Sequence, residues 1–386
     1  MSEPLALYIH WPFCVSKCPY CDFNSHVRKS VNQDVWRDAL LADLAHEAAL
    51  TEGRKLGSVF FGGGTPSLMP PETVAALIKA AEQHWSFASD IEITLEANPS
   101  SVEAARFADL AAAGVNRVSL GLQALDDAAL AFLGRAHRVE ESLAALDTAQ
   151  NRFGRVSIDL IYARPGQSEA LWDAELGRAI GFGTEHMSLY QLTIEPGTRF
   201  ATDVAQGDLM PLNDDAAADL YVLTQERMEA AGLPAYEISN HAAPGQESRH
   251  NLAYWRYQDY AGIGPGAHGR RGGMATMRHR KPENFLGAVA RNGNGLKSEE
   301  VLGPATQAME ALLMGLRLRE GVDISALADR FSIDSADLLD WGAVDKLEGS
   351  GFVNRGVWKV SVTPKGFPLL DAILPQIVAI EPAVAA

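Results

Sequence analysis

The stretch LALYIHWPFCVSKCPYC, residues 5–21, places a short apolar run with high β-propensity directly before three cysteines. Cys14, Cys18 and Cys21 are the only cysteines among the 386 residues. A CxxxCxxC spacing on a short loop can direct three thiolates at one point. An iron–sulfur cubane normally takes four thiolates, one for each iron. Three protein ligands would therefore leave one iron open to bind another molecule.

Other uses of the three cysteines fit this spacing less well. An odd number of cysteines cannot pair completely in disulfides within one chain. A structural zinc site usually takes four ligands, often as two CxxC-type pairs. His10 or His26 would supply the fourth ligand, so a zinc-stabilised structural or adaptor protein stays an alternative.

The composition is that of a globular protein, with 47% hydrophobic and 21% charged residues, and its length indicates about two or three domains. The net charge of −16 disfavours nucleic acid as a general partner, because an acidic surface repels phosphates. We expect no membrane span and no signal peptide, since the sequence has neither a run of about 18 apolar residues nor a basic leader. Thiols that bind a cluster need a reducing compartment, which favours the cytoplasm.

Strand-like and helix-like segments alternate through the first half of the chain. Strands are expected at residues 5–9, 58–61, 91–95, 117–122, 156–162 and 186–192. Amphipathic helices are expected at residues 31–50, 72–83, 102–113, 140–149 and 170–180. A repeat of roughly 30 residues is typical of βα units in a parallel sheet. Because six units fall short of the eight in a closed barrel, we predict an α/β fold with an open (β/α)6 partial TIM barrel, and keep a doubly wound sheet as the alternative.

The chain is predicted to have further parts after this barrel of residues 1–200. Residues 201–300 form an extension, in which 235–300 show little regular pattern. Residues 301–376 are expected to form a small winged-helix-like domain of helices and two short strands, followed by a tail, 377–386, whose end is expected to be disordered. Five acids against one lysine in residues 334–349 argue against a DNA-reading helix there.

Polar residues stand where the predicted parallel strands end. The cysteine loop follows the first strand and the run GGGTPS, residues 62–67, follows the second. Glu96 ends the third strand, Gln123 ends the fourth, and Asp159 lies in the fifth. Ligands of parallel α/β folds bind at the carboxyl ends of the strands. We therefore expect these five features to face one opening.

The residue types at this opening suit a small polar ligand. Glycines at 62–64 let a backbone approach a ligand closely, although a tight strand–helix turn would use them equally well. The amide of Gln123 suits a ribose or a carboxylate, and the guanidinium of Arg135 can fork onto a carboxylate. Asp159 lies among apolar neighbours and needs a polar partner. The alternatives are a helix cap for Glu96 and a surface ion pair for Arg135.

The cysteine spacing, with Tyr20 before the last cysteine, resembles the signature of the radical S-adenosylmethionine (SAM) superfamily. In that superfamily the open iron of a [4Fe-4S] cluster chelates the amino and carboxylate groups of SAM. The resemblance implies cluster ligands at Cys14, Cys18 and Cys21, and SAM contacts at Gly63, Gly64, Thr65, Glu96, Gln123, Arg135 and Asp159.

Over most of its length the chain is similar to the oxygen-independent coproporphyrinogen III oxidase family. The similar segments are YIHWPFC (8–14), GGGTPS (62–67), GLQ (121–123), LGRAH (133–137), DLIY (159–162) and LTIEPG (192–197). By this resemblance Tyr8 and Tyr20 pack around SAM and the cluster. The oxidases of the family read CxxxCxxCxC, whereas Phe23 stands here in place of the fourth cysteine. The sequence also contains His250-Asn-Leu-Ala-Tyr-Trp255, which matches an HNxxYW motif. In both features the chain resembles the haem chaperone (HemW) branch of the family.

The resemblance implies a function and its partners. A protein of this branch binds the cluster, SAM and haem, and delivers haem to apo-haemoproteins. His250 is the expected axial haem ligand, with His241 and His268 as alternatives. Arg249 or Arg256 would pair with a haem propionate. The rival function is oxidative decarboxylation of coproporphyrinogen III; whether SAM is cleaved and whether the chain forms a homodimer stay open hypotheses.

Overall fold

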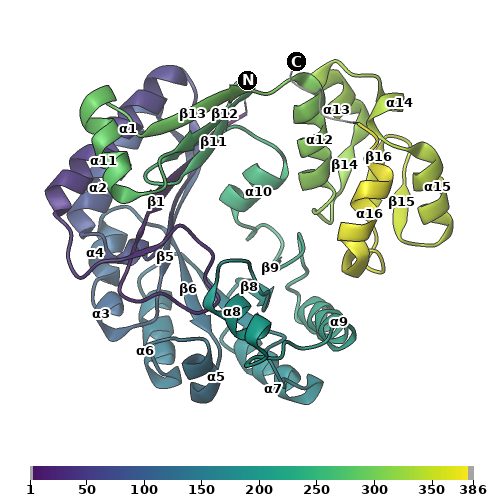
Figure 1. The fold of residues 1–386 in the computed structure, drawn as a ribbon, viewed down its shortest axis with the longest axis horizontal. Helices are drawn as coiled ribbons and strands as arrows, with labels where there is room; N and C mark the ends of the chain where they lie inside the picture. Colours follow the sequence, from purple (N-terminus) through teal and green to yellow (C-terminus); the bar gives the residue numbers. More distant parts are fainter. Residues whose placement is uncertain (1–2, 381–386) are drawn as a thin grey trace.

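The computed structural model describes residues 3–380 and contains one large curved sheet, an outer layer of helices and a smaller C-terminal domain (Figure 1). Six parallel strands occupy the centre of the sheet in their order along the chain: β1 (Leu5–Trp11), β4 (Leu56–Gly63), β5 (Phe87–Ala97), β6 (Arg117–Gln123), β7 (Arg155–Tyr162) and β8 (His186–Gln191). In a doubly wound sheet the order of the consecutive βα strands reverses, whereas these six strands keep a single order. The two edge strands do not pair with each other, so the predicted open barrel is confirmed.

Helices follow the strands and pack along the outside of the sheet (Figure 1). They are α1 (Gln33–Leu50), α2 (Pro71–Trp85), α3 (Ser101–Ala104), α4 (Phe107–Ala112), α5 (Asp127–Phe132), α6 (Val139–Gln150) and α7 (Glu169–Ile180). Side-chain caps begin several of them, as where Asn32 accepts from the amide of Val35 at 3.2 Å. The prediction of one continuous helix over 102–113 is wrong, because the helix is interrupted between α3 and α4.

The region from 235 to 300 is more regular than its sequence indicates. It contains β9 (Asn240–Ala242), α10 (Arg249–Trp255), β10 (Tyr260–Ile263), β11 (His268–Arg271), β12 (Met274–Arg278), α11 (Pro282–Asn292) and β13 (Leu296–Val301). β10 lies parallel to β1, and β11 to β13 continue the same sheet as antiparallel strands. α10 lies inside the curve of the sheet, where it contacts β4 and α12 (Figure 1). The predicted boundary near residue 200 remains a prediction.

The C-terminal domain has its own apolar core and a three-stranded antiparallel sheet in the order β14-β16-β15. Its elements are α12 (Pro304–Gly315), β14 (Val322–Asp323), α13 (Ile324–Phe331), α14 (Ser335–Leu338), α15 (Trp341–Gly349), β15 (Val353–Arg355), β16 (Lys359–Val362) and α16 (Leu370–Ile377). This composition confirms the predicted winged-helix-like domain. Most of the tail that the sequence predicts to be disordered, residues 381–386, lies outside the described residues.

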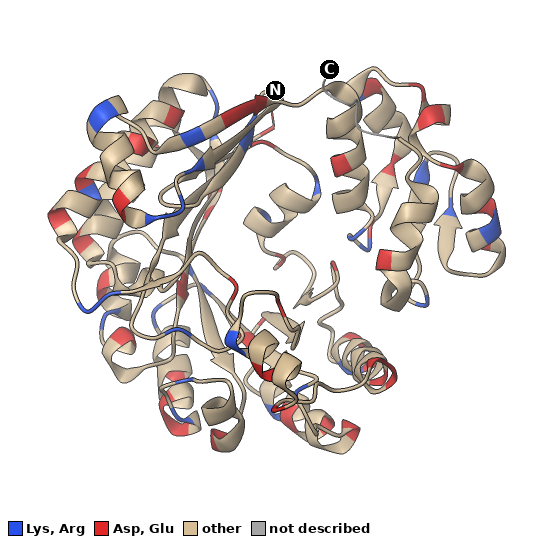
Figure 2. Cartoon of the chain, in the orientation of Figure 1, with Lys and Arg blue, Asp and Glu red and all other residues tan. Residues whose placement is uncertain are grey.

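Two further helices, α8 (Arg199–Gln206) and α9 (Asp214–Ala230), lie in the chain between β8 and β9. Figure 2 shows acidic residues on most of the outer helices, with basic residues spread among them. No helix within residues 3–380 combines the length and apolar character needed to cross a membrane.

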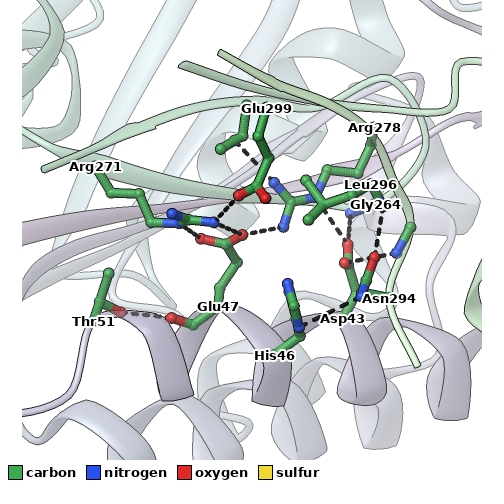
Figure 3. A network of polar contacts seen from close by, with 12 residues as sticks. Asp43, His46, Glu47, Thr51, Gly264, Arg271, Arg278, Asn294, Leu296 and Glu299 are labelled. Atoms are coloured by element: carbon green, nitrogen blue, oxygen red, sulfur yellow. Dashed lines mark hydrogen bonds and ion pairs between the residues drawn. The ribbon is translucent and has the colours of Figure 1, made fainter. Parts of the chain in front are cut away.

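A buried ionic network ties α1 to the edge strands (Figure 3). Glu47 of α1 accepts from Nε of Arg271 at 2.8 Å and from Nη2 of Arg278 at 2.6 Å. Asp43, one turn earlier, meets Nε of Arg278 at 3.3 Å. The side chains of Asp43, Glu47 and Arg278 are fully buried. Burial alone would raise the pKa of Glu47, but the two guanidinium groups hold it below its ordinary value.

We predict that Arg278→Ala lowers the free energy of unfolding by about 3–5 kcal/mol, because it leaves two buried carboxylates without their shared partner. The matched control is Arg28→Ala, which breaks a surface pair with Glu283 and should cost about 0–1 kcal/mol. Urea unfolding of both variants measures the difference. Equal losses would contradict a structural role for the network.

Candidate functional site

A cavity of about 1050 Å³ opens at the carboxyl ends of the parallel strands and extends to the C-terminal domain. Its walls combine the cysteine loop, the ends of the strands from β4 to β8 and residues of the C-terminal domain. The predicted site residues that line it are Cys14, Cys18, Cys21, Tyr20, Gly63, Gly64, Thr65, Glu96, Gln123, Arg135 and Asp159. Tyr8 and His250 are not among its lining residues.

The cysteine loop begins in the two-residue strand β2 (Phe13–Cys14), and all three cysteines are free and half-buried. Each sulfur has at least one polar side chain beside it. The pairs are Thr65 Oγ1 and Cys14 Sγ at 3.5 Å, Arg135 Nη1 and Cys18 Sγ at 3.4 Å, and Ser25 Oγ and Cys21 Sγ at 3.7 Å. Burial raises the pKa of the Cys14 thiol. The guanidinium of Arg135 places a positive charge beside the sulfur of Cys18.

The chemistry of this donor set fits an iron–sulfur cluster better than one metal ion. Within residues 3–380, no three His, Cys, Asp or Glu side chains are grouped closely enough to bind a single ion. A cubane binds each thiolate through a different iron, so its ligands stand further apart. His10 is not free as a zinc ligand, because Nδ1 is 2.9 Å from the hydroxyl of Tyr8 and Nε2 is 2.9 Å from the carbonyl of Asn24.

The glycine loop packs directly on the strand that carries the cysteines. The amide of Gly64 donates to the carbonyl of Trp11 at 2.7 Å, and the amide of Thr65 donates to the carbonyl of Phe13 at 2.9 Å. A Cβ atom on Gly64 would lie 2.7 Å from the Phe13 carbonyl oxygen. Gly63 has φ +116°, which disfavours other residues. The glycines are therefore needed for this backbone contact, whatever else they bind.

Two half-buried carboxyl groups lie in the middle of the cavity wall. Glu96 on β5 accepts from the amide of Gly63 at 3.2 Å, and Asp159 on β7 accepts from the hydroxyl of Ser119 at 2.9 Å. Burial raises the pKa of both groups, and the negative charge of Asp159 helps to raise that of Glu96 to about 8. No described cation forms a salt bridge with either group. The pair would therefore favour a ligand with a cationic or hydroxylated group.

Arg135 lies between α5 and α6, where it connects the cysteine loop to the strand ends. Besides Cys18 it donates to the carbonyl of Gly121 at 3.3 Å and to Oδ1 of Asn98. Its Nε is buried and has no hydrogen-bond partner among the described residues, which leaves a donor for a bound carboxylate. Gln123, on the same wall, has φ +67°, an unusual conformation of the kind found at ligand sites.

Sequence reasoning missed Asn98 as a member of the site. Its Nδ2 donates to Thr65 Oγ1 at 3.3 Å, and its Oδ1 accepts from Arg135, so it links the glycine loop to the arginine. The available signal was a second polar residue two positions after Glu96, just beyond the strand end. Tyr190, Arg317 and Phe367 also line the cavity without having been predicted.

Tyr8 and His250 lie close together, apart from the residues that line the cavity. Their ring centroids are 6.3 Å apart, and both rings stack against Phe60. Nδ1 of His250 is 3.0 Å from the hydroxyl of Ser58, and Nε2 is 2.9 Å from that of Tyr254. Burial lowers the pKa of His250 to about 3, so the ring is neutral. Both nitrogens are occupied in this conformation.

The other predicted haem-binding residues also lie away from the cavity lining. His241 is buried, with Nε2 3.3 Å from Gln225, while His268 is exposed on β11. Arg249 pairs with Asp90, and Arg256 pairs with Glu320 at 2.7 Å. Each of these arginines already has a carboxylate partner.

The open barrel, with its cysteine loop and glycine loop at one mouth, defines a protein of the radical SAM class. Residues 8–175 match the family model "Radical SAM superfamily", and residues 302–369 match "HemN C-terminal domain". The chain resembles the solved coproporphyrinogen III oxidase (HemN) of Escherichia coli with a TM-score of 0.83 over 97% of this chain and 90% of that one, at 24% identity. At this identity the match shows the fold alone.

Named relatives are similar over most of the chain. The heme chaperone HemW of Escherichia coli is 41% identical over 82% of this chain and 83% of its own length. HemW of Bacillus subtilis is 32% identical over 93% and 95%. The mouse mitochondrial radical S-adenosyl methionine domain-containing protein 1 is 42% identical over 83% and 75%. The chain therefore belongs to the HemW family of the radical SAM superfamily.

We predict that Glu96→Gln stabilises the ligand-free protein in a pH-dependent way. The folded protein keeps the Glu96 proton up to about pH 8, whereas the unfolded chain loses it near 4.5, so the stability of the folded state falls as pH rises between these values. The variant should melt within about 1 °C of wild type at pH 5 and roughly 2–4 °C higher at pH 8.

Thermal melts at the two pH values measure this difference. The exposed glutamate Glu82 of α2 gives the control, Glu82→Gln, which should shift the melting temperature equally at both. A pH-independent effect of Glu96→Gln would show that its carboxyl group is not the titrating one.

Proposed function

We propose that the protein binds a [4Fe-4S] cluster and SAM at the mouth of the barrel, and holds haem for delivery to apo-haemoproteins. The observation that carries the proposal is the convergence of three free thiols, a guanidinium and a glycine loop on one cavity, in a chain 41% identical to a protein named as a haem chaperone.

Cys14, Cys18 and Cys21 would each bind one iron of the cluster. When bound, the cluster would supply an open iron for the amino and carboxylate groups of SAM and a source of one electron. The chain's own residues would orient that ligand. Nε of Arg135 is a buried donor without a partner among the described residues, and Glu96 lines the same cavity. The strand-end residues Gln123 and Asp159 would then contact hydroxyl groups.

The cavity has room for more than one ligand. Small-molecule sites typically occupy about 300–1,000 Å³, and this cavity reaches about 1050 Å³. Its far wall is largely apolar and aromatic, with residues from α9 and the C-terminal domain. The lining residues there are Asp214, Ala217, Ala218 and Tyr221 of α9, Arg317, Phe367, Pro368, Leu370 and Asp371 of the C-terminal domain, and Ile238 and Ser239 between them. A flat apolar macrocycle would pack on the apolar residues of this wall, and its anionic edge would have to compete with Asp371 for Arg317, which donates to that carboxylate at 3.3 Å. His250 does not line the cavity, so to ligate the iron its neutral ring would have to reach the cavity and exchange its hydrogen bonds to Ser58 and Tyr254.

A reducing location such as the cytoplasm, transfer to apo-haemoproteins and a homodimer are parts of this proposal. The free cysteines favour the first of them. The name of the mouse relative assigns that protein to mitochondria.

Anaerobic reconstitution tests the cluster. Wild type should gain about four iron and four sulfide per chain and absorb broadly near about 400 nm. Cys18→Ala should lose most of this uptake, because one iron loses its ligand. The matched control is Ser16→Ala in the same loop, which should load like wild type. Wild-type protein that takes up neither iron nor sulfide would contradict the proposal.

Haem titration tests His250. His250→Ala should weaken haem binding by roughly tenfold or more and change the Soret band, and added imidazole should restore the spectrum. Ser58→Ala is the control, because it removes a hydrogen bond to the ring without removing the ligand. Equal weakening in both variants, without rescue by imidazole, would assign His250 a structural role. Turnover of coproporphyrinogen III with SAM and a reductant would favour the rival oxidase function.

A further inference from the structure

Asn24 connects the cysteine loop to three other segments of the chain. Its Nδ2 donates to the carbonyl of Pro265 at 2.8 Å and to the carbonyl of Arg280 at 3.0 Å. Its own main-chain carbonyl accepts from Nε2 of His10 at 2.9 Å. A carbonyl can only accept, so this Nε2 carries the proton and Nδ1 accepts from Tyr8. The direction of each of these hydrogen bonds around Asn24 is therefore defined.

The β10–β11 loop, which contains Pro265, packs too closely against its neighbours to accept a side chain at Gly264 or Gly266. Gly264 and Gly266, in the loop between β10 and β11, have φ +92° and +82°. A Cβ atom on Gly264 would lie 2.3 Å from the carbonyl oxygen of His10, and one on Gly266 would lie 2.3 Å from Asn24 Nδ2. The amide of Gly264 also donates to the buried carboxylate of Asp43 at 3.1 Å (Figure 3). Nothing larger than glycine fits this contact.

The same contact closes the loop that carries the thiols. The short strand β3 (His26–Val27) pairs with β2, and the amide of His26 donates to the carbonyl of Pro12 at 2.7 Å. Asn24 lies three residues after Cys21 and two before His26, so it fixes the returning arm of the loop. Phe23 beside it is exposed and makes no comparable contact.

We propose that Asn24 is a positioning residue for the cluster cysteines: its side-chain amide fastens the returning arm of the loop to the β10–β11 and β12–α11 loops, so that Cys18 and Cys21 stay directed into the cavity. This inference rests on the proposed cluster site. Among side chains as short as that of asparagine, only its amide donates two hydrogen bonds from one nitrogen. The carboxylate of an aspartate, which has the same length, would instead direct acceptors toward two carbonyl oxygens.

Asn24→Ala, Asn24→Asp and Gly266→Ala test the inference, with Asn151→Ala as the control. Asn151 is exposed on the outside of the barrel, where its side chain bonds only within its own helix end. In the reconstituted protein the first three variants should lose iron to a chelator about tenfold faster than wild type and give an altered EPR spectrum after reduction. The control should match wild type.

A second readout needs no cluster. In ligand-free protein, Asn24→Ala should change the alkylation rates of Cys18 and Cys21 several-fold, while the melting temperature confirms that the chain is folded. Wild-type rates of alkylation and iron loss in both Asn24 variants would overturn the inference. Wild-type protein that takes up no iron at all would instead overturn the proposed function, whatever the alkylation rates.

Discussion

The backbone contact between the glycine loop and the cysteine-bearing strand is the constraint on which the site depends. Gly64 and Thr65 bond to the carbonyls of Trp11 and Phe13, and no side chain fits between the two backbones. The contact brings the end of β4 against the start of the thiol loop, while Asn98 and Arg135 connect that pair to the next strand ends. Main-chain contacts thus fix the glycine loop against the thiol loop without help from a bound cofactor.

The edge of the sheet contributes to the same site from the opposite side. β10 extends the sheet beyond β1, and the buried network of Asp43, Glu47 and Arg278 fixes the loops that follow it. Breaking such a buried pair is costly because the remaining charge has no water to stabilise it. The extension is therefore more than a decoration of the barrel, since its β10–β11 loop reaches the thiol loop through Asn24.

The sequence was sufficient for the parts of the fold that repeat and for the residues that follow strands. Six parallel strands could be predicted from hydrophobic runs, and the cysteine loop, the glycine loop, Glu96, Gln123 and Asp159 from their places in or after those strands. Arg135 was expected from its chemistry, and Tyr20 from the family resemblance. The strands β11 to β13 could not be predicted, because they are short, and β13 is largely exposed, so no apolar alternation marks it. Asn24 and Asn98 act through contacts with distant segments, and local sequence does not record such contacts. His250 was recognisable as part of a motif, but its enclosure by Ser58, Phe60 and Tyr254 is a tertiary feature.

The central claim is that the three cysteines and the glycine loop form one site in which a cluster keeps an iron open for SAM. EPR of the reduced, reconstituted protein with and without SAM tests it most directly. If SAM binds the open iron, it should change the g values of the cluster signal, and ¹⁷O- or ¹⁵N-labelled SAM should show coupling to iron. A cluster signal that SAM leaves unchanged would contradict the central claim.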